Sequence, residues 1–321
     1  MPPSYAGQDR ESLLADVAEM YYLEERGQAE IARTIGVTRS MISRLLTEAR
    51  AKGIVEIRVR RTLQRDHDLE AQLVSRFGLE AACVSAVPAR ASAERLLSYL
   101  GKAGAQTLVR YLAPGNILGL AWGTSVSATV DAVEVEQPLD LKLVQLVGAM
   151  GARNAQYDGH ALILRLAEKL GGEGYYLNAP FLCPNRETAE ALRRTQSIKD
   201  TIELGARANV ALLGVGSSDP QSSSYFLAGY VSSREQARLQ RAGAVGDVCG
   251  LHFDLQGRHV CEDFTARCLT ICKDDLFNIP VRVGVAGGAG KVGPVLGALR
   301  GGFVNVMVTD SVTARQVLEQ A

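Results

Sequence analysis

Three glycine-flanked groups of polar residues could bind a small anionic or hydroxylated molecule. Gly123, Thr124 and Ser125 follow an apolar run at 117–122 and precede a helical pattern at 125–135. Backbone N–H groups at a helix N-terminus, with two hydroxyls, form a site that suits a phosphate. A plain glycine turn with Thr124 as the helix cap has the same sequence. Asp247, in a turn at 243–247, could accept hydrogen bonds from sugar hydroxyls or simply cap that turn.

The glycine-rich segment 286–302 places Lys291 after a predicted strand. Its glycines at 288, 290 and 293 match a dinucleotide fingerprint, but only 28 residues follow the third, too few for the rest of such a domain. A P-loop is also excluded, because Val292 stands where Ser or Thr is required and Val285 where the first Gly is required. Lys291 remains as a counter-ion for a phosphate or a partner for a carbonyl, or as a solvated surface lysine.

A metal site is a further candidate. Four residues of zinc-ligand type lie within thirteen positions: Cys249, His252, His259 and Cys261. The segment 249–261 also has the pattern of a hairpin turning at 255–257, and alternation along its strand puts Cys249 and His252 on opposite faces. Buried thiols and ordinary strand histidines are therefore favoured, and we expect no metal and no cofactor.

The N-terminal part of the chain is strongly basic, although the whole chain has 35 basic and 35 acidic residues. Between Arg26 and Arg65 there are ten Lys or Arg and three Glu, an excess of seven positive charges. Such a compact basic segment favours a polyanionic partner.

The same region has the pattern of a winged helix-turn-helix. Helices are expected at 12–25, 28–34 and 38–52, with Thr38 as N-cap of the third. Ala32 allows close approach of the second and third helices, and Gly36 allows a left-handed turn between them. A short strand at 54–60 would form the wing.

The third helix then has a core side and an exposed side. Thr38, Ile42, Leu45, Leu46 and Ala49 are expected to face inward, which leaves two arginines and three hydroxyls outside. Arginine can bond guanine bidentately, and hydroxyls can contact bases or phosphates. The wing arginines would contact phosphates. The expected DNA-binding residues are Thr38, Arg39, Ser40, Ser43, Arg44, Thr47, Arg58 and Arg60. A solvated helix face is the alternative.

The remainder alternates between strand-like and helix-like stretches, which is typical of an α/β domain with a mainly parallel sheet. Strands are expected at 82–87, 117–122, 141–147, 209–215, 281–286 and 303–308. Two domains follow, 1–62 for DNA binding and 63–321 for the α/β domain with its candidate ligand site. Six irregularly spaced Cys are no disulfide framework. There is no secretory signal and no apolar run of about 18 residues, so we expect a cytoplasmic protein without a membrane partner.

Taken together, the motifs resemble those of the SorC/DeoR-type bacterial sugar-responsive transcriptional regulators. The segment QAEIARTIGVTRSMISRLLTEARAKGIVEIRV resembles their DNA-binding domain. The motifs NILGLAWGTSV, LVQLVGAMG, LNAPF, VALLGVGS, GAVGD, HFDLQG, VAGGAGK and ALRGGFVNVMVTD follow in the order of their effector domain. The resemblance implies an effector fold related to ribose-5-phosphate isomerase. It also implies a homotetramer, or dimer of dimers, on a palindromic operator, and a sugar, polyol or sugar-phosphate effector.

The resemblance also implies roles for particular residues. It places Gly123, Thr124 and Ser125 in the phosphate loop, and Gly148 and Gly151 in the turn that flanks the sugar. Asp247 falls where an acidic residue contacts hydroxyls, and Lys291 falls where a lysine contacts the phosphate or the sugar head. Gln156 is a further candidate for effector binding. Val147 departs from the pattern, because a polar or acidic residue is expected before that glycine. The competing class is a sugar-phosphate isomerase or deaminase with a fused helix-turn-helix. Proton abstraction needs a positioned base, and no acid–base constellation accompanies Asp247 and Asp254, so we expect no enzyme.

Overall fold

The structure is a computed structural model, and it describes residues 9–55, 63–88, 91–151, 157–227 and 229–321. The chain divides into two compact units, Met1–Thr62 and Leu63–Ala321. Each unit has its own hydrophobic core. No helix among the described residues is long and apolar enough to cross a bilayer.

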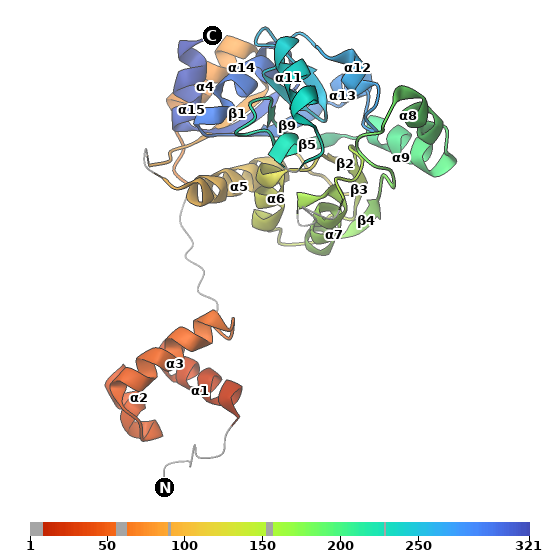
Figure 1. Ribbon diagram of the computed structural model, residues 1–321. Coiled ribbons are helices and arrows are strands. Elements are labelled where there is room, and N and C mark those ends of the chain that lie inside the picture. Colours follow the sequence, from red (N-terminus) through yellow and green to blue (C-terminus); the bar gives the residue numbers. More distant parts are fainter. Residues whose placement is uncertain (1–8, 56–62, 89–90, 152–156, 228) are drawn as a thin grey trace. The chain divides into compact units, whose positions relative to one another are not determined.

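The described part of the N-terminal unit, residues 9–55, forms the helices α1 (Arg10–Tyr22), α2 (Gln28–Ile35) and α3 (Arg39–Ala51) (Figure 1). Gly36 ends α2 in the left-handed conformation, with φ +80°, and so permits the sharp turn into α3. Ile31 and Ala32 of α2 pack in one core with Ile42 and Leu45 of α3. These contacts confirm the helix-turn-helix that the sequence predicts.

Two details of this unit differ from expectation, and a third expectation falls on residues that the structure does not describe. Thr38 was expected to face the core, but it is exposed, because its hydroxyl caps α3 by accepting a hydrogen bond from the Met41 N–H at 3.3 Å. α1 ends at Tyr22, three residues before the expected end. Arg58 and Arg60 of the expected wing lie outside the described residues.

The C-terminal unit is built on a seven-stranded, entirely parallel sheet, with strand order β1-β10-β9-β5-β2-β3-β4. The strands are β1 (Ala81–Ser85), β2 (Ile117–Leu120), β3 (Leu141–Gln145), β4 (Gly172–Tyr175), β5 (Val210–Gly214), β9 (Val281–Val285) and β10 (Val306–Asp310). A second, antiparallel sheet contains β6 (Gly216–Ser217), β7 (Gly246–Val248) and β8 (Leu251–Phe253). The predicted α/β class is confirmed.

Helices cover both faces of the parallel sheet (Figure 1). On one face lie α5 (Ala93–Val109), α6 (Thr124–Ala132) and α7 (Gly159–Leu170). On the other lie α4 (His67–Phe77), α9 (Gln196–Ala206), α14 (Val292–Arg300) and α15 (Ser311–Glu319). Along β5, Val210 and Leu212 join the first core while Ala211 and Leu213 join the second. The unbroken apolar runs of the sequence reflect strands that are buried on both sides.

The remaining helices are short or peripheral. They are α8 (Arg186–Arg193), α10 (Ser224–Leu227), α11 (Ser233–Arg241), α12 (Glu262–Thr265) and α13 (Lys273–Asn278). Ala189 of α8 and Ile198 of α9 form a small core of their own with Leu269.

The expected hairpin around Cys249 is only partly correct. A turn does lie at 254–258, where the Asp254 N–H donates to the Arg258 carbonyl at 3.0 Å. However, Cys249 and Gly250 form a second, tight turn between β7 and β8, with φ +54° and +76°. The prediction that Cys249 and His252 lie on opposite faces of one strand is therefore wrong, because Cys249 is not in a strand.

Candidate functional site

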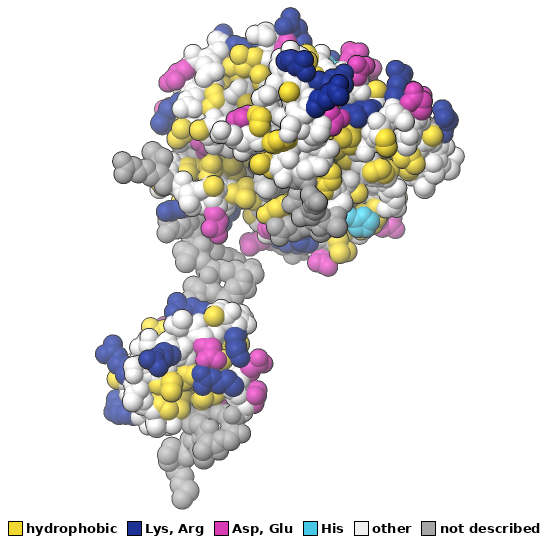
Figure 2. Space-filling view, viewed as in Figure 1, with side chains coloured by type: hydrophobic (Ala, Val, Ile, Leu, Met, Phe, Trp, Pro, Cys, Tyr) yellow, Lys and Arg dark blue, Asp and Glu magenta, His cyan; other side chains and the backbone are white. Residues whose placement is uncertain are grey.

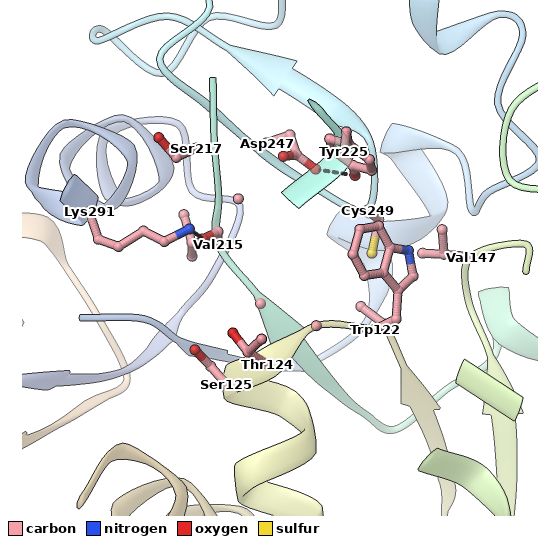
Figure 3. Close-up of a pocket in the computed structure, with 14 residues that line it drawn as sticks. Trp122, Thr124, Ser125, Val147, Val215, Ser217, Tyr225, Asp247, Cys249 and Lys291 are labelled. Carbon is pink, nitrogen blue, oxygen red and sulfur yellow. Dashed lines mark hydrogen bonds between the residues drawn. The ribbon is translucent and has the colours of Figure 1, made fainter. Parts of the chain in front are cut away.

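One pocket of the C-terminal unit lies where β2, β3, β5 and β9 end. Its lining residues are Ala121, Trp122, Gly123, Thr124, Ser125, Val147, Gly214, Val215, Gly216, Ser217, Tyr225, Asp247, Cys249 and Lys291 (Figure 3). The chain leaves β2 toward α6 on one face of the sheet, whereas the chain after β9 enters α14 on the other face. Ligands of open α/β sheets bind at such a point, where the connections diverge outside the carboxyl ends of the strands.

The first polar wall is the N-terminus of α6. Gly123 precedes this helix with φ +133°, a conformation open to glycine, so that the chain turns directly from β2 into the helix. Thr124 and Ser125 occupy its first turn, and both side chains face the cavity (Figure 3). The first N–H groups of a helix have no acceptor within it, and its dipole favours negative charge there. This wall can bind an anion.

Lys291 supplies the second polar wall. It ends a short 3-10 turn, Ala289–Lys291, and its Nζ donates to the Val215 carbonyl at 2.8 Å. That bond leaves two ammonium donors for a ligand. Burial lowers the pKa of Lys291 from its ordinary value, and the nearby Asp247 carboxylate partly offsets this. A ligand anion beside this ammonium would favour its charged form and so offset the effect of burial.

Asp247 forms the third polar wall and is almost fully buried. Its Oδ2 accepts hydrogen bonds from the Tyr225 hydroxyl at 2.7 Å and the Gly250 N–H at 3.0 Å (Figure 3). Its Oδ1, beside Gly216, has no hydrogen-bond partner among the described residues. A buried acceptor without a partner is costly, so this oxygen is suited to a donor that a ligand brings, such as a hydroxyl.

The far end of the pocket is apolar. Trp122, Cys249 and Val147 line this end, and Figure 3 shows the Trp122 indole beside Val147. Trp122 also packs edge-on against Tyr225, with ring centroids 5.1 Å apart, and Tyr225 stacks on Phe181. Burial raises the pKa of the Cys249 thiol, so this thiol stays neutral. The valine at 147 thus contributes a methyl surface where a polar side chain was expected.

The structure gathers five of the eight expected effector residues around this pocket: Gly123, Thr124, Ser125, Asp247 and Lys291. Gly148 and Gly151 are not among its lining residues. A Cβ on Gly148 would lie 2.8 Å from the Ala179 carbonyl oxygen and 2.9 Å from the Phe181 nitrogen, so this glycine permits close backbone packing. Gln156 lies outside the described residues.

Sequence reasoning missed the apolar Ala121 and Val215 of the pocket and four larger or more polar side chains, Trp122, Ser217, Tyr225 and Cys249. Trp122 and Ser217 carried a usable signal, because they lie two and three residues after the apolar strands β2 and β5 end, at the edge where ligands bind. Tyr225 carried none, since it comes from a short helix within a long connection. The four zinc-type residues at 249–261 do not assemble, and no group of three or more His, Cys, Asp or Glu in the described ranges could hold a metal ion.

A second candidate site is the exposed side of α3. Arg39, Ser40, Ser43, Arg44 and Thr47 are all exposed, opposite the buried Ile42, Leu45, Leu46 and Ala49. Thr47 donates its hydroxyl to the Ser43 carbonyl at 2.9 Å, and the Thr38 and Ser40 hydroxyls lie 3.0 Å apart. The N-terminal residues of such a helix contact base edges when it enters the major groove.

Comparisons with known proteins identify the family of the chain. Residues 61–319 match the family described as "Putative sugar-binding domain". The sorbitol operon regulator of Klebsiella pneumoniae is 31% identical over 309 residues, which are 96% of this chain and 98% of that protein. The transcriptional regulator LsrR of Enterobacter sp. (strain 638) is 32% identical over 317 residues, 97% of this chain and 94% of that protein.

A solved structure agrees over the same length. The crystal structure of the full-length sorbitol operon regulator SorC from Klebsiella pneumoniae has a TM-score of 0.72 and 30% identity, and covers 97% of this chain and 100% of that chain. The similarity therefore includes the N-terminal unit as well as the sugar-binding unit. Since it extends along nearly the whole chain, the protein belongs to the SorC/DeoR-type family of sugar-binding transcriptional regulators, and it is a regulator and not an enzyme.

Proposed function

We propose that this protein is a cytoplasmic regulator of an operon for carbohydrate or polyol catabolism, and that a small sugar phosphate controls its binding to operator DNA. The observation that carries this proposal is the composition of the pocket. The α6 N-terminus and Lys291 offer positive potential on two walls, while the unpartnered Oδ1 of Asp247 offers an acceptor on a third. An anion and a hydroxyl on one small molecule would satisfy all three.

In this proposal the N-terminal unit, residues 1–62, reads the operator through α3. Arg44 and the hydroxyls of Ser40 and Ser43 would contact base edges, while other basic side chains would contact phosphates. The arginines of the expected wing, Arg58 and Arg60, belong to the second group. The excess of positive charge between Arg26 and Arg65 supports a DNA partner, because each neutralised phosphate releases counterions and adds affinity.

The effector would act by binding more tightly to one arrangement of the assembly than to another. Two-fold symmetric assemblies bind palindromic sites at a fixed half-site spacing, so a change in subunit geometry changes operator affinity. We propose a homotetramer, arranged as a dimer of dimers, as the assembly that carries this change. Sedimentation of the full chain with and without operator DNA measures its stoichiometry.

A mobility-shift experiment tests the proposal. The full chain is used to select duplexes from random-sequence DNA, and the retained duplex is titrated in the presence of sugars, polyols and their phosphates. We expect a phosphorylated compound to change the Kd for DNA at least tenfold, and its unphosphorylated parent to change it little. Unchanged DNA binding after removal of residues 1–60 would contradict the proposal that the N-terminal unit binds the operator. A response to unphosphorylated compounds alone would contradict the proposal that the effector is a sugar phosphate.

A further inference from the structure

The start of α3 carries exposed apolar surface that the proposed contacts with phosphates and guanine do not use. Among the described residues, five large hydrophobic side chains are exposed: Leu23, Val37, Met41, Leu164 and Leu227. Two of them, Val37 and Met41, lie within five positions at the N-terminal end of the recognition helix, with exposed fractions of 36% and 41%. The other three are scattered singly, which is ordinary for a protein surface.

Met41 does not belong to the hydrophobic core that the described residues of this unit form. It is the third residue of α3, and the core side of this helix is formed by Ile42, Leu45, Leu46 and Ala49. Val37 precedes the N-cap, where an apolar residue commonly packs on the fourth helical residue, here Ile42. That role accounts for Val37, whereas Met41 has 41% of its surface exposed and needs another explanation.

The neighbours of Met41 identify what would cover it. Arg44 lies three positions further along the same exposed side of the helix, so the two side chains are adjacent. Arg44 makes no ion pair with another described residue. Figure 2 shows hydrophobic side chains exposed between Lys and Arg side chains on the surface of the N-terminal unit. Apolar surface bordered by cations suits the major groove, where the thymine 5-methyl group is the apolar feature and guanine offers acceptors to arginine.

We propose that Met41 reads a thymine methyl group in each operator half-site, next to the guanine that Arg44 contacts. This inference rests on the proposed DNA-binding function. Residues three apart in a helix are separated by about 4.5 Å along its axis. Successive base pairs are about 3.4 Å apart. The two side chains therefore match neighbouring base pairs, and Met41 contributes to specificity as well as to affinity.

Deoxyuridine scanning tests this contact, because deoxyuridine lacks only the 5-methyl group of thymidine. The probe is the duplex that the full chain selects from random-sequence DNA, with each thymidine replaced singly. We expect one replacement next to the preferred guanine to weaken binding of the wild type about fourfold, the equivalent of ~0.8 kcal/mol for one buried methyl group. Met41→Ala removes the contact in both half-sites, so it should weaken binding to the unmodified duplex about 15-fold, the equivalent of two buried methyl groups, and be insensitive to that replacement. Met41→Leu retains the sensitivity.

Two control variants distinguish the loss of a methyl contact from a general loss of affinity for DNA. Leu23→Ala removes an exposed apolar side chain from the same unit and should leave binding to both duplexes unchanged. Arg44→Ala should bind more weakly and retain the full deoxyuridine penalty. If Met41→Ala keeps that penalty, or if no thymidine is sensitive in the wild type, Met41 does not read a methyl group, although specific DNA binding stands. Failure to select any specific sequence would overturn both this inference and the proposed function.

Discussion

Replacing Lys291 with Met separates the function of this residue from its contribution to the fold. The ammonium makes one hydrogen bond, to the Val215 carbonyl at 2.8 Å, while burial lowers its pKa. A lysine whose pKa is lower in the folded state than in the unfolded state destabilises the fold at any pH where it is charged. Methionine fills a similar volume without this cost. We therefore expect the ligand-free Lys291→Met variant to unfold at the same temperature as the wild type or at a higher one.

Effector binding should change in the opposite direction. A charge-assisted hydrogen bond contributes about 1.5–3 kcal/mol, so the loss of Lys291 should weaken binding of a sugar phosphate about 10- to 150-fold. A ligand at 100 times its Kd stabilises the folded state by about 2.7 kcal/mol. For a unit of this size that corresponds to a rise in Tm of about 5–10 °C. At the same ligand concentration, a variant with a 100-fold weaker Kd keeps only about 0.4 kcal/mol.

Thermal unfolding monitored by intrinsic fluorescence measures both quantities, and calorimetry gives the Kd. The sugar phosphate is the one that changes operator binding in the mobility-shift experiment. Binding should also weaken as the pH rises through the lowered pKa of Lys291, before the ordinary pKa of lysine is reached, because the neutral amine loses its attraction for the anion. An unchanged effector Kd in Lys291→Met would refute the proposed role of this residue, and a large drop in the ligand-free Tm would show that Lys291 is structural.

Three further substitutions test the fold and its sites. Glu70 is buried, and burial raises the pKa of its carboxyl, but hydrogen bonds from Arg65 at 2.7 and 2.8 Å and from other donors lower this pKa overall. Glu70→Gln should therefore lower the free energy of unfolding by about 1–3 kcal/mol at pH 7. Chemical denaturation should show this difference shrinking as the pH falls below about 4. Thr38→Ala removes the cap of α3 and should destabilise the N-terminal unit by about 1 kcal/mol in the same assay, with no effect on effector binding. Gly148→Ala places a Cβ against backbone atoms of residues 179–181 and should lower the free energy of unfolding by about 1–3 kcal/mol, measured as a lower Tm. An unchanged Tm would show that this segment can shift to accept the added methyl group.

The sequence predicted the architecture well where local patterns determine structure. Runs such as 210–214 are buried on both faces, so they have the β-rich, apolar composition by which parallel strands are identified. β4 was missed because its sequence, GEGY, has two glycines and lies at the edge of the sheet, where the strand needs little apolar surface. The turn at Cys249 was missed because a left-handed cysteine has no sequence signature.

The site was less accessible to sequence reasoning. Lys291 and the Thr124–Ser125 pair were identified because glycines next to a strand end mark where ligands approach the backbone. Asp247 was identified from a glycine-flanked turn, although the structure places it in β7 and not in the turn. Their meeting in one pocket depends on the strand order, which places β2 beside β5 and β5 beside β9. Tyr225, which donates to Asp247, comes from a connection of irregular structure, and no periodicity could place it.

The most direct test of the account is the operator affinity of the full chain with and without a saturating sugar phosphate, measured by fluorescence anisotropy for the wild type and for Lys291→Met. The account predicts that the compound changes the Kd for operator DNA at least tenfold in the wild type. It also predicts that the variant binds the same operator with unchanged Kd and does not respond at that concentration. An operator Kd that responds equally in both proteins would contradict the claim that the pocket at Lys291 controls DNA binding.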